Sequence, residues 1–157
     1  MAEFLERIEA PEVREIYANL DAVWTERADR LNRRLRDEGL PMQVANMSSI
    51  WTVSYTRPSR YNWMLQYYLR AEGLALSWIG TGRLIFSLNY TETDFEAVAD
   101  RFVAAARAMQ QDGWWWCDPL ATNKSIRRRI LREIRCPQTV GQSSGRRLAP
   151  SVDGPWL

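Results

Sequence analysis

The sequence predicts an α+β domain of two layers, in which a small, mostly antiparallel sheet packs against amphipathic helices. Three observations lead to this prediction. A long helical pattern comes first, short segments rich in β-branched and aromatic residues follow, and a second long helical pattern comes after them. The 157 residues are enough for one such core and too few for two full domains. We therefore expect one α/β sandwich of a small sheet and three helices.

The first predicted helix covers residues 11–38. Pro11 suits its first turn, where a backbone N–H would have no intrahelical partner, and Gly39 followed by Pro41 is the expected stop. Charged residues fill one side of this helix. The other side is an apolar stripe at helical spacing, formed by Val13, Ile16, Tyr17, Leu20, Trp24, Leu31 and Leu35.

The next segment predicts two short strands and a short helix. Residues 42–55 are rich in Val, Ile, Trp, Thr and Tyr around a small polar group, so two strands are expected. Residues 56–59 contain Pro58 and predict a loop. Helical spacing of apolar residues returns at 61–69, and Gly73 is the expected end of that helix.

A glycine-bearing turn, Gly80-Thr81-Gly82, separates two further apolar segments. Residues 74–79 are expected to re-enter the core, and residues 83–90 to form a buried strand. Glycines let backbone N–H groups approach a phosphate, but a phosphate-binding loop needs further spaced glycines or a Lys-Ser/Thr pair at a helix start. Because a strand follows here, a plain turn is favoured.

The second long helix has a well-marked start. Thr91 and Asp94 have the spacing of a capping box, in which hydroxyl and carboxylate satisfy free backbone donors. Gly113 is the expected end. The predicted packing face consists of Phe95, Val98, Phe102, Val103, Ala106 and Met109.

The chain changes character after residue 113. Three tryptophans at 114–116 precede a predicted basic helix at 123–135, whose apolar stripe is Ile126, Ile130, Leu131 and Ile134. From Pro137 on, Pro, Gly, Ser, Gln and Arg without periodicity predict a disordered tail. The expected organisation is a domain at residues 1–113, a Trp-rich segment with a basic helix at 114–136, and a tail at 137–157.

Composition excludes several classes of enzyme. The chain has no histidine, which removes Ser-His-Asp and Cys-His nucleophile systems and most transition-metal sites. Cys117 and Cys136 are expected to be free thiols, because two thiols cannot complete a zinc site. No apolar run approaches the roughly 20 residues that cross a bilayer, and the start lacks a basic-then-apolar leader. A cytoplasmic protein without a membrane partner is expected.

Few residues are candidates for chemistry. Lys124 is the only lysine, but its polar surroundings do not suit a Schiff base, which needs a desolvated amine. The arginines of residues 123–135 could follow a phosphate backbone, and the tryptophans could stack bases. The apolar stripe favours docking on protein instead, so no nucleic acid is expected. Acidic residues are spread over helix faces, and no general acid–base pair is predicted.

Two stretches resemble a known family. Residues 43–56, Gln-Val-Ala-Asn-Met-Ser-Ser-Ile-Trp-Thr-Val-Ser-Tyr-Thr, are similar to the segment in which a turn joins two strands of the small domain of class III, fold-type I pyridoxal-phosphate aminotransferases. Residues 83–95, Arg-Leu-Ile-Phe-Ser-Leu-Asn-Tyr-Thr-Glu-Thr-Asp-Phe, are similar to the closing strand and final helix of that domain. The resemblance covers about residues 3–112 and is nearest to the glutamate-1-semialdehyde aminomutase kind.

The resemblance implies a C-terminal fragment of an aminotransferase or aminomutase. Such enzymes bind pyridoxal phosphate between a large domain and this small one, and the large domain carries the Schiff-base lysine. This chain is therefore expected to bind no cofactor by itself and to have no activity alone. Its expected partners are the missing large domain or a second subunit, with a homo-oligomer possible. Arg83 stands near the position where some relatives hold a substrate carboxylate, although a plain strand-edge arginine is the favoured interpretation.

A second hypothesis belongs to another class. In this hypothesis the chain is a stand-alone interaction module that keeps the small-domain fold. It would bind a partner through the three tryptophans at 114–116 and the basic helix at 123–135.

The composition of the tail generates a first prediction. A nonspecific protease should cut the chain first after about residue 137 and leave a resistant core, because segments without apolar periodicity open most readily. Mass spectrometry of the fragments over time measures the order of cleavage. Equal resistance along the whole chain would contradict the assignment of the tail.

Overall fold

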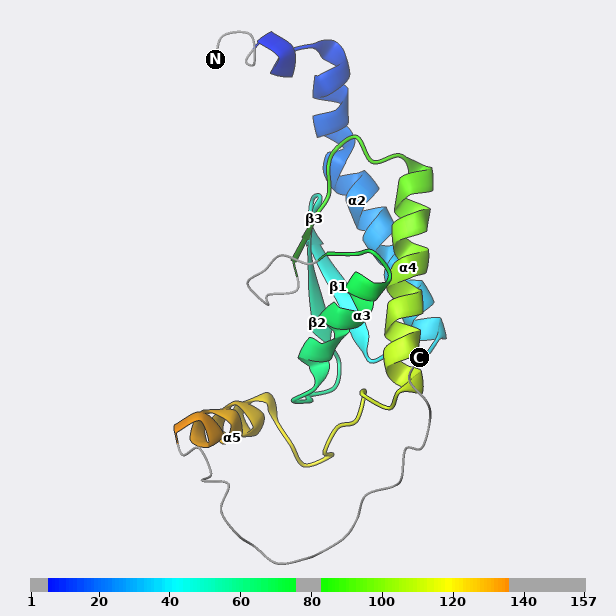
Figure 1. The fold of residues 1–157 in the computed structure, drawn as a ribbon. Coiled ribbons are helices and arrows are strands. Elements are labelled where there is room, and N and C mark those ends of the chain that lie inside the picture. The colour runs from blue at the N-terminus through cyan, green and yellow to red at the C-terminus, as the bar shows by residue number, and fades with distance from the viewer. Residues whose placement is uncertain (1–5, 76–82, 136–157) are drawn as a thin grey trace, which may run out of the picture.

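The computed structural model describes residues 6–75 and 83–135, and these form the α+β fold that the sequence predicts (Figure 1). Their elements are α2 (Pro11–Asp37), β1 (Met42–Met47), β2 (Ile50–Tyr55), η1 (Asn62–Met64), α3 (Leu65–Ala71), β3 (Arg83–Ile85), α4 (Glu92–Gln111) and α5 (Asn123–Arg135). The strands form one antiparallel sheet in the order β1-β2-β3. The predicted Gly80-Thr81-Gly82 turn, Cys136 and the tail at 137–157 lie outside the described residues.

The predicted strand at residues 83–90 is too long. β3 ends at Ile85, which pairs with Ile50, the first residue of β2. The next backbone N–H, that of Phe86, donates to the carbonyl of Ser49, 3.0 Å away in the hairpin turn. Beyond this point β2 offers β3 no further partner, so the chain leaves the sheet although its apolar residues continue. Strand length is set here by the neighbour and not by local composition.

The sheet buries one face. Because side chains alternate along a strand, every second residue points toward the helices. The buried members of this face are Met42, Val44, Trp51, Val53, Leu84 and Phe86. Helices α2 and α4 lie together on that side of the sheet, and α3 packs against α4 (Figure 1). The core therefore lies between one sheet face and the helix layer.

Aromatic rings fill the centre of this core. Trp51 of β2 is fully buried and meets the rings of Trp24, Phe86 and Phe95 at centroid distances of 6.0, 5.0 and 5.9 Å. Trp24 also stacks on Phe86 at 5.1 Å. Edge-to-face and offset ring pairs are favourable in addition to the apolar area they bury. The cluster connects α2, the hairpin, the end of β3 and the start of α4.

Arg27 closes the aromatic cluster on its outer side. Its guanidinium lies 4.7 Å from the ring centroid of Trp24 and 5.4 Å from that of Phe95. The same group donates to Glu92 at 3.4 Å and to the carbonyl of Tyr90 at 3.3 Å. Its burial is tolerated because the charge has both an anionic partner and π faces.

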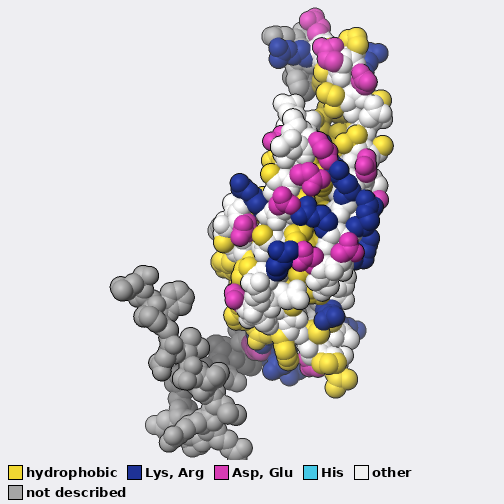
Figure 2. All heavy atoms as spheres, turned by 90° about the vertical axis from the view of Figure 1, so that its right-hand side faces the viewer, with side chains coloured by type: hydrophobic (Ala, Val, Ile, Leu, Met, Phe, Trp, Pro, Cys, Tyr) yellow, Lys and Arg dark blue, Asp and Glu magenta, His cyan; other side chains and the backbone are white. Residues whose placement is uncertain are grey.

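Helices α2 and α4 are joined by a ladder of ion pairs. Arg30 pairs with Glu92 and Glu96, and Arg34 pairs with Glu96 and Asp100. Figure 2 shows the resulting alternation of basic and acidic side chains over this face. The hydrogen bond from Arg30 lowers the pKa of Glu92. All of these acids are well exposed, so the ladder orients the helices more than it stabilises the fold.

Asn32 fixes α2 to the first strand. Its side-chain amide accepts from the backbone N–H of Val44 at 2.8 Å and donates to the carbonyl of the same residue at 2.9 Å. One polar side chain in the middle of an amphipathic helix thus satisfies both backbone groups of a buried residue.

The predicted capping box at the start of α4 is confirmed. The Thr91 hydroxyl accepts from the backbone N–H of Asp94 at 3.2 Å, and the Asp94 carboxylate accepts from the backbone N–H of Thr91 at 2.9 Å. The end is confirmed as well, since Gly113 has φ +76°, which glycine adopts without steric cost.

The capping box generates a second prediction. Thr91→Ala should lower the free energy of unfolding by about 1 kcal/mol, because it leaves a helix N–H without its acceptor. Urea denaturation followed by circular dichroism measures the loss. Thr93→Ala is the matched control, since Thr93 is exposed in the same first turn and is not the cap. Equal losses in both variants would argue against a role for the cap.

Candidate functional site

The second face of the sheet is the first candidate surface. The register places Met47 opposite Ile50 and Ile50 opposite Ile85, so these residues form one row across the three strands. Their exposed fractions are 72%, 37% and 72%. Directly opposed side chains on a sheet lie close enough to touch. The row is therefore a continuous apolar strip open to solvent, which is unusual on the free face of an antiparallel sheet.

Arg83, the candidate substrate-binding residue, lies on this same open face. It is the first residue of β3, is exposed, and pairs with Thr52 of β2, which in turn pairs with Ala45. The row Ala45-Thr52-Arg83 is thus adjacent to the apolar row. Within residues 6–75 and 83–135, Arg83 forms no ion pair.

This arrangement can bind an anion with an apolar neighbour. A guanidinium presents a planar pair of donors that matches a carboxylate, and the Thr52 hydroxyl across the strand pair can donate as well. The strip of Met47, Ile50 and Ile85 next to it suits apolar surface. We call these two rows together the open-face site.

Lys124 is not part of the open-face site. It is the second residue of α5 and is exposed. Two hydroxyls cap the start of this helix. The Thr122 Oγ1 accepts a hydrogen bond from the backbone N–H of Ser125 at 3.1 Å, and the Ser125 Oγ accepts one from the backbone N–H of Thr122 at 2.9 Å. A Schiff-base lysine needs a pocket that excludes water. The described residues therefore do not form a pyridoxal-phosphate site around the one lysine.

The three tryptophans point in different directions. Trp115 packs on the core, and its indole N–H donates to the carbonyl of Ala106 at 3.0 Å. Trp114 and Trp116 lie on either side of Tyr61, with centroid distances of 5.5 and 6.3 Å. Their exposed fractions are 37% and 60%. A single flat partner such as a nucleobase cannot contact all three rings, and the two exposed rings are available to another surface.

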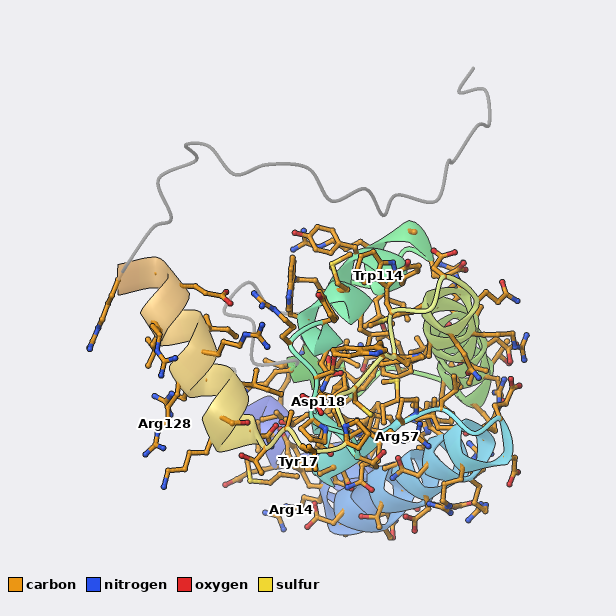
Figure 3. All side chains as sticks on the ribbon, turned by 90° about the horizontal axis from the view of Figure 1, so that it is seen from below. Arg14, Tyr17, Arg57, Trp114, Asp118 and Arg128 are labelled. Atoms are coloured by element: carbon orange, nitrogen blue, oxygen red, sulfur yellow. The ribbon has the colours of Figure 1, made fainter. Side chains whose placement is uncertain are left out.

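Helix α5 stands to one side of the domain body (Figure 3). Its arginines, Arg127, Arg128, Arg129, Arg132 and Arg135, are all exposed. Two contacts hold the helix and the segment before it: Arg60 bonds both carboxylate oxygens of Glu133, at 3.1 and 2.8 Å, and the Ser59 hydroxyl donates to the carbonyl of Trp116 at 2.6 Å. The apolar stripe is incompletely covered, because Leu131 is 44% and Ile134 70% exposed.

Two tyrosines among the described residues have shifted pKa values. Burial, together with a 2.6 Å hydrogen bond to Asp112, raises the pKa of Tyr68 to about 12. Burial also raises the pKa of Tyr55 to about 12. Phenols shifted in this direction are poorer proton donors at neutral pH. Among the described residues no group of three or more His, Cys, Asp or Glu side chains could hold a metal ion.

The sequence indicated Arg83 as a candidate and did not indicate its neighbours in the open-face site. Strand alternation alone puts Thr52 and Arg83 on exposed positions, yet only the pairing register shows that they are neighbours. The contact between Arg60 and Glu133 was also missed, since 73 residues separate them along the chain. Cys117 is half-buried and bonds no other cysteine within the described residues.

Comparison of the chain with models of protein families and with curated proteins gives no match. In addition, none of the helices described here is both long and apolar enough to cross a bilayer.

The exposure of Lys124 generates a third prediction. Incubation with pyridoxal phosphate and then borohydride should give no saturable, stoichiometric label, because the exposed Lys124 amine has no pocket that holds the aldehyde beside it. Mass spectrometry of the reduced chain measures the label. Lys124→Ala should leave cofactor absorbance unchanged. Stoichiometric labelling of Lys124 with turnover of an amino donor would overturn the fragment hypothesis.

Proposed function

We propose that this chain is the small domain of a pyridoxal-phosphate aminotransferase or aminomutase of the class III kind, and that it works only when a large domain covers its open-face site. The observation that carries the proposal is the open-face site itself. An apolar strip lies beside an arginine that forms no ion pair within the described residues. The family resemblance of residues 43–56 and 83–95 lies in the strands that form this face.

The order of the elements supports this proposal. The helix, hairpin, closing strand and capped helix follow the order that the resemblance implies. In the parent enzymes the cofactor supplies the electron sink for moving an amino group. This chain would supply a wall of the substrate pocket, with Arg83 as the group that holds a substrate carboxylate. No step of the chemistry is assigned to its other residues.

The alternative function is a stand-alone interaction module. The observation in its favour is that Trp114, Trp116 and the stripe of α5 are exposed outside the region of resemblance. Such a module would recognise a protein partner and catalyse nothing. The two proposals differ in which surface must be covered for function: the open sheet face for the enzyme fragment, and the Trp-rich segment with α5 for the module.

The open-face site generates a fourth prediction. The full chain should bind a hydrophobic dye, and the double variant Met47→Gln/Ile85→Thr should bind clearly less, because both apolar side chains are 72% exposed. Dye fluorescence measures the change, and urea denaturation checks that the fold persists. Leu120→Ser is the matched control, since Leu120 is 91% exposed but lies outside the sheet.

A second measurement tests the enzyme directly. The coding sequence upstream of Met1 should specify a large domain, and its product should associate with this chain and bind pyridoxal phosphate on its own lysine. Arg83→Met should then weaken binding of carboxylate substrates without loss of association. A dye-silent chain without such an upstream partner would instead favour the stand-alone module.

A further inference from the structure

The first half of α2 carries an apolar groove far from the open-face site. The groove is about 320 Å³ in volume and runs between α2 and the loop from β3 to α4. Ile16, Leu20, Val23 and Leu88 supply its apolar lining. Ile16 is 43% and Val23 40% exposed. We call this hollow the α2 groove.

The stripe of α2 continues past the edge of the core. From Trp24 to Leu35 its apolar residues are buried, whereas from Val13 to Val23 they are exposed or half-buried. The helical spacing is the same in both halves, so the sequence provides a packing face for which the described domain has no matching surface. Figure 1 shows this half of α2 extending beyond the sheet.

The rim of the groove is acidic. Glu12 and Glu15 line it, and the one cation in the lining, Arg27, is already paired with Glu92. An occupant should therefore be apolar on one side and basic along its flanks.

Helix α5 has these properties. Its 13 residues include six Lys or Arg and one acid, Glu133, which Arg60 neutralises. Ile126 and Ile130 are half-buried and line a hollow with Ser59 and Trp116 of the same chain, so the free part of the apolar stripe is Leu131 and Ile134. Arg127 lies one turn before Leu131 on the same side of the helix, whereas Arg132 lies on the other side. The helix is about 20 Å long, similar to the exposed half of α2.

The α5 of the same chain does not occupy the groove. The groove adjoins the start of β2, where Trp24 stacks on Phe86, whereas α5 is tied to the loop after the end of β2 through Arg60. Six strand residues separate these places, a distance of about 17 Å. Figure 1 shows α5 and the first half of α2 at opposite ends of the domain.

We propose that two copies of this chain form a two-fold dimer in which the α5 of each copy lies in the α2 groove of the other. Leu131 and Ile134 of α5 pack on Ile16, Leu20 and Val23, and Arg127 approaches Glu12 and Glu15. In a two-fold dimer the contact between α5 and the α2 groove forms twice. Neither copy then has an unoccupied α5 or α2 groove, so the assembly ends at two copies. The proposal does not depend on the chain being an enzyme fragment.

Charge reversal tests the dimer, and this is the fifth prediction. Sedimentation equilibrium of the full chain should show a monomer–dimer transition. Glu12→Lys/Glu15→Lys and, separately, Arg127→Glu should each raise the dimer dissociation constant about tenfold, because each places like charges across both contacts. An equimolar mixture of the two variants should regain wild-type affinity, since each groove then meets an α5 of opposite charge.

Two matched controls keep the test specific. Asp21→Lys and Arg132→Glu reverse charges on the same helices but lie outside the proposed contact, and these variants should dimerise like wild type. Circular dichroism checks folding in every variant. Three outcomes would overturn the proposal: a chain that stays monomeric, a dimer whose dissociation constant is the same in both test variants as in wild type, or an equimolar mixture of the two test variants that does not regain wild-type affinity. So would a monomer that binds anionic phospholipid vesicles through α5, as a basic amphipathic helix can.

Discussion

The packing around Trp51 is the constraint on which the rest of the fold depends. Its ring contacts residues from α2, from the end of β3 and from α4, and it is among the largest fully buried side chains of the core. The indole Nε1 is buried and has no hydrogen-bond partner among the described residues. Such a donor costs about 1–3 kcal/mol, so the aromatic contacts must exceed this cost for the arrangement to be stable. The hairpin and both long helices thus meet at this side chain.

Patterns of residues close together in the sequence predicted the helices and strands well. The features that were not predicted depend on contacts between residues far apart in the sequence. The start of α4 follows from Thr91 and Asp94, which are three residues apart, and the end of α2 follows from Gly39. The length of β3 did not follow, because it depends on where β2 begins. The burial of Arg27 could not be predicted either, since its partners Tyr90 and Glu92 lie more than 60 residues away.

The candidate surfaces likewise combine features that the sequence predicts with features that only the fold shows. Alternation within a strand predicts that Arg83 is on one face, but its neighbours come from the register. The apolar stripe of α2 predicted a packing face along the whole helix, but its first half is exposed or half-buried in the structure. What the pattern could not show is that the domain covers only the part from Trp24 onward. Helical periodicity predicts that a face is buried, but it does not identify the surface that buries it.

The bond between Asn32 and Val44 has a consequence for how the sheet can grow. An unpaired strand edge offers free N–H and C=O groups to any extended chain, and proteins that leave it open risk adding strands from other molecules. At the centre of β1 both of these groups are already bonded to Asn32. A foreign strand would have to displace the side chain of a packed helix to continue the ladder there. Edge-to-edge aggregation through β1 is therefore blocked by a single amide.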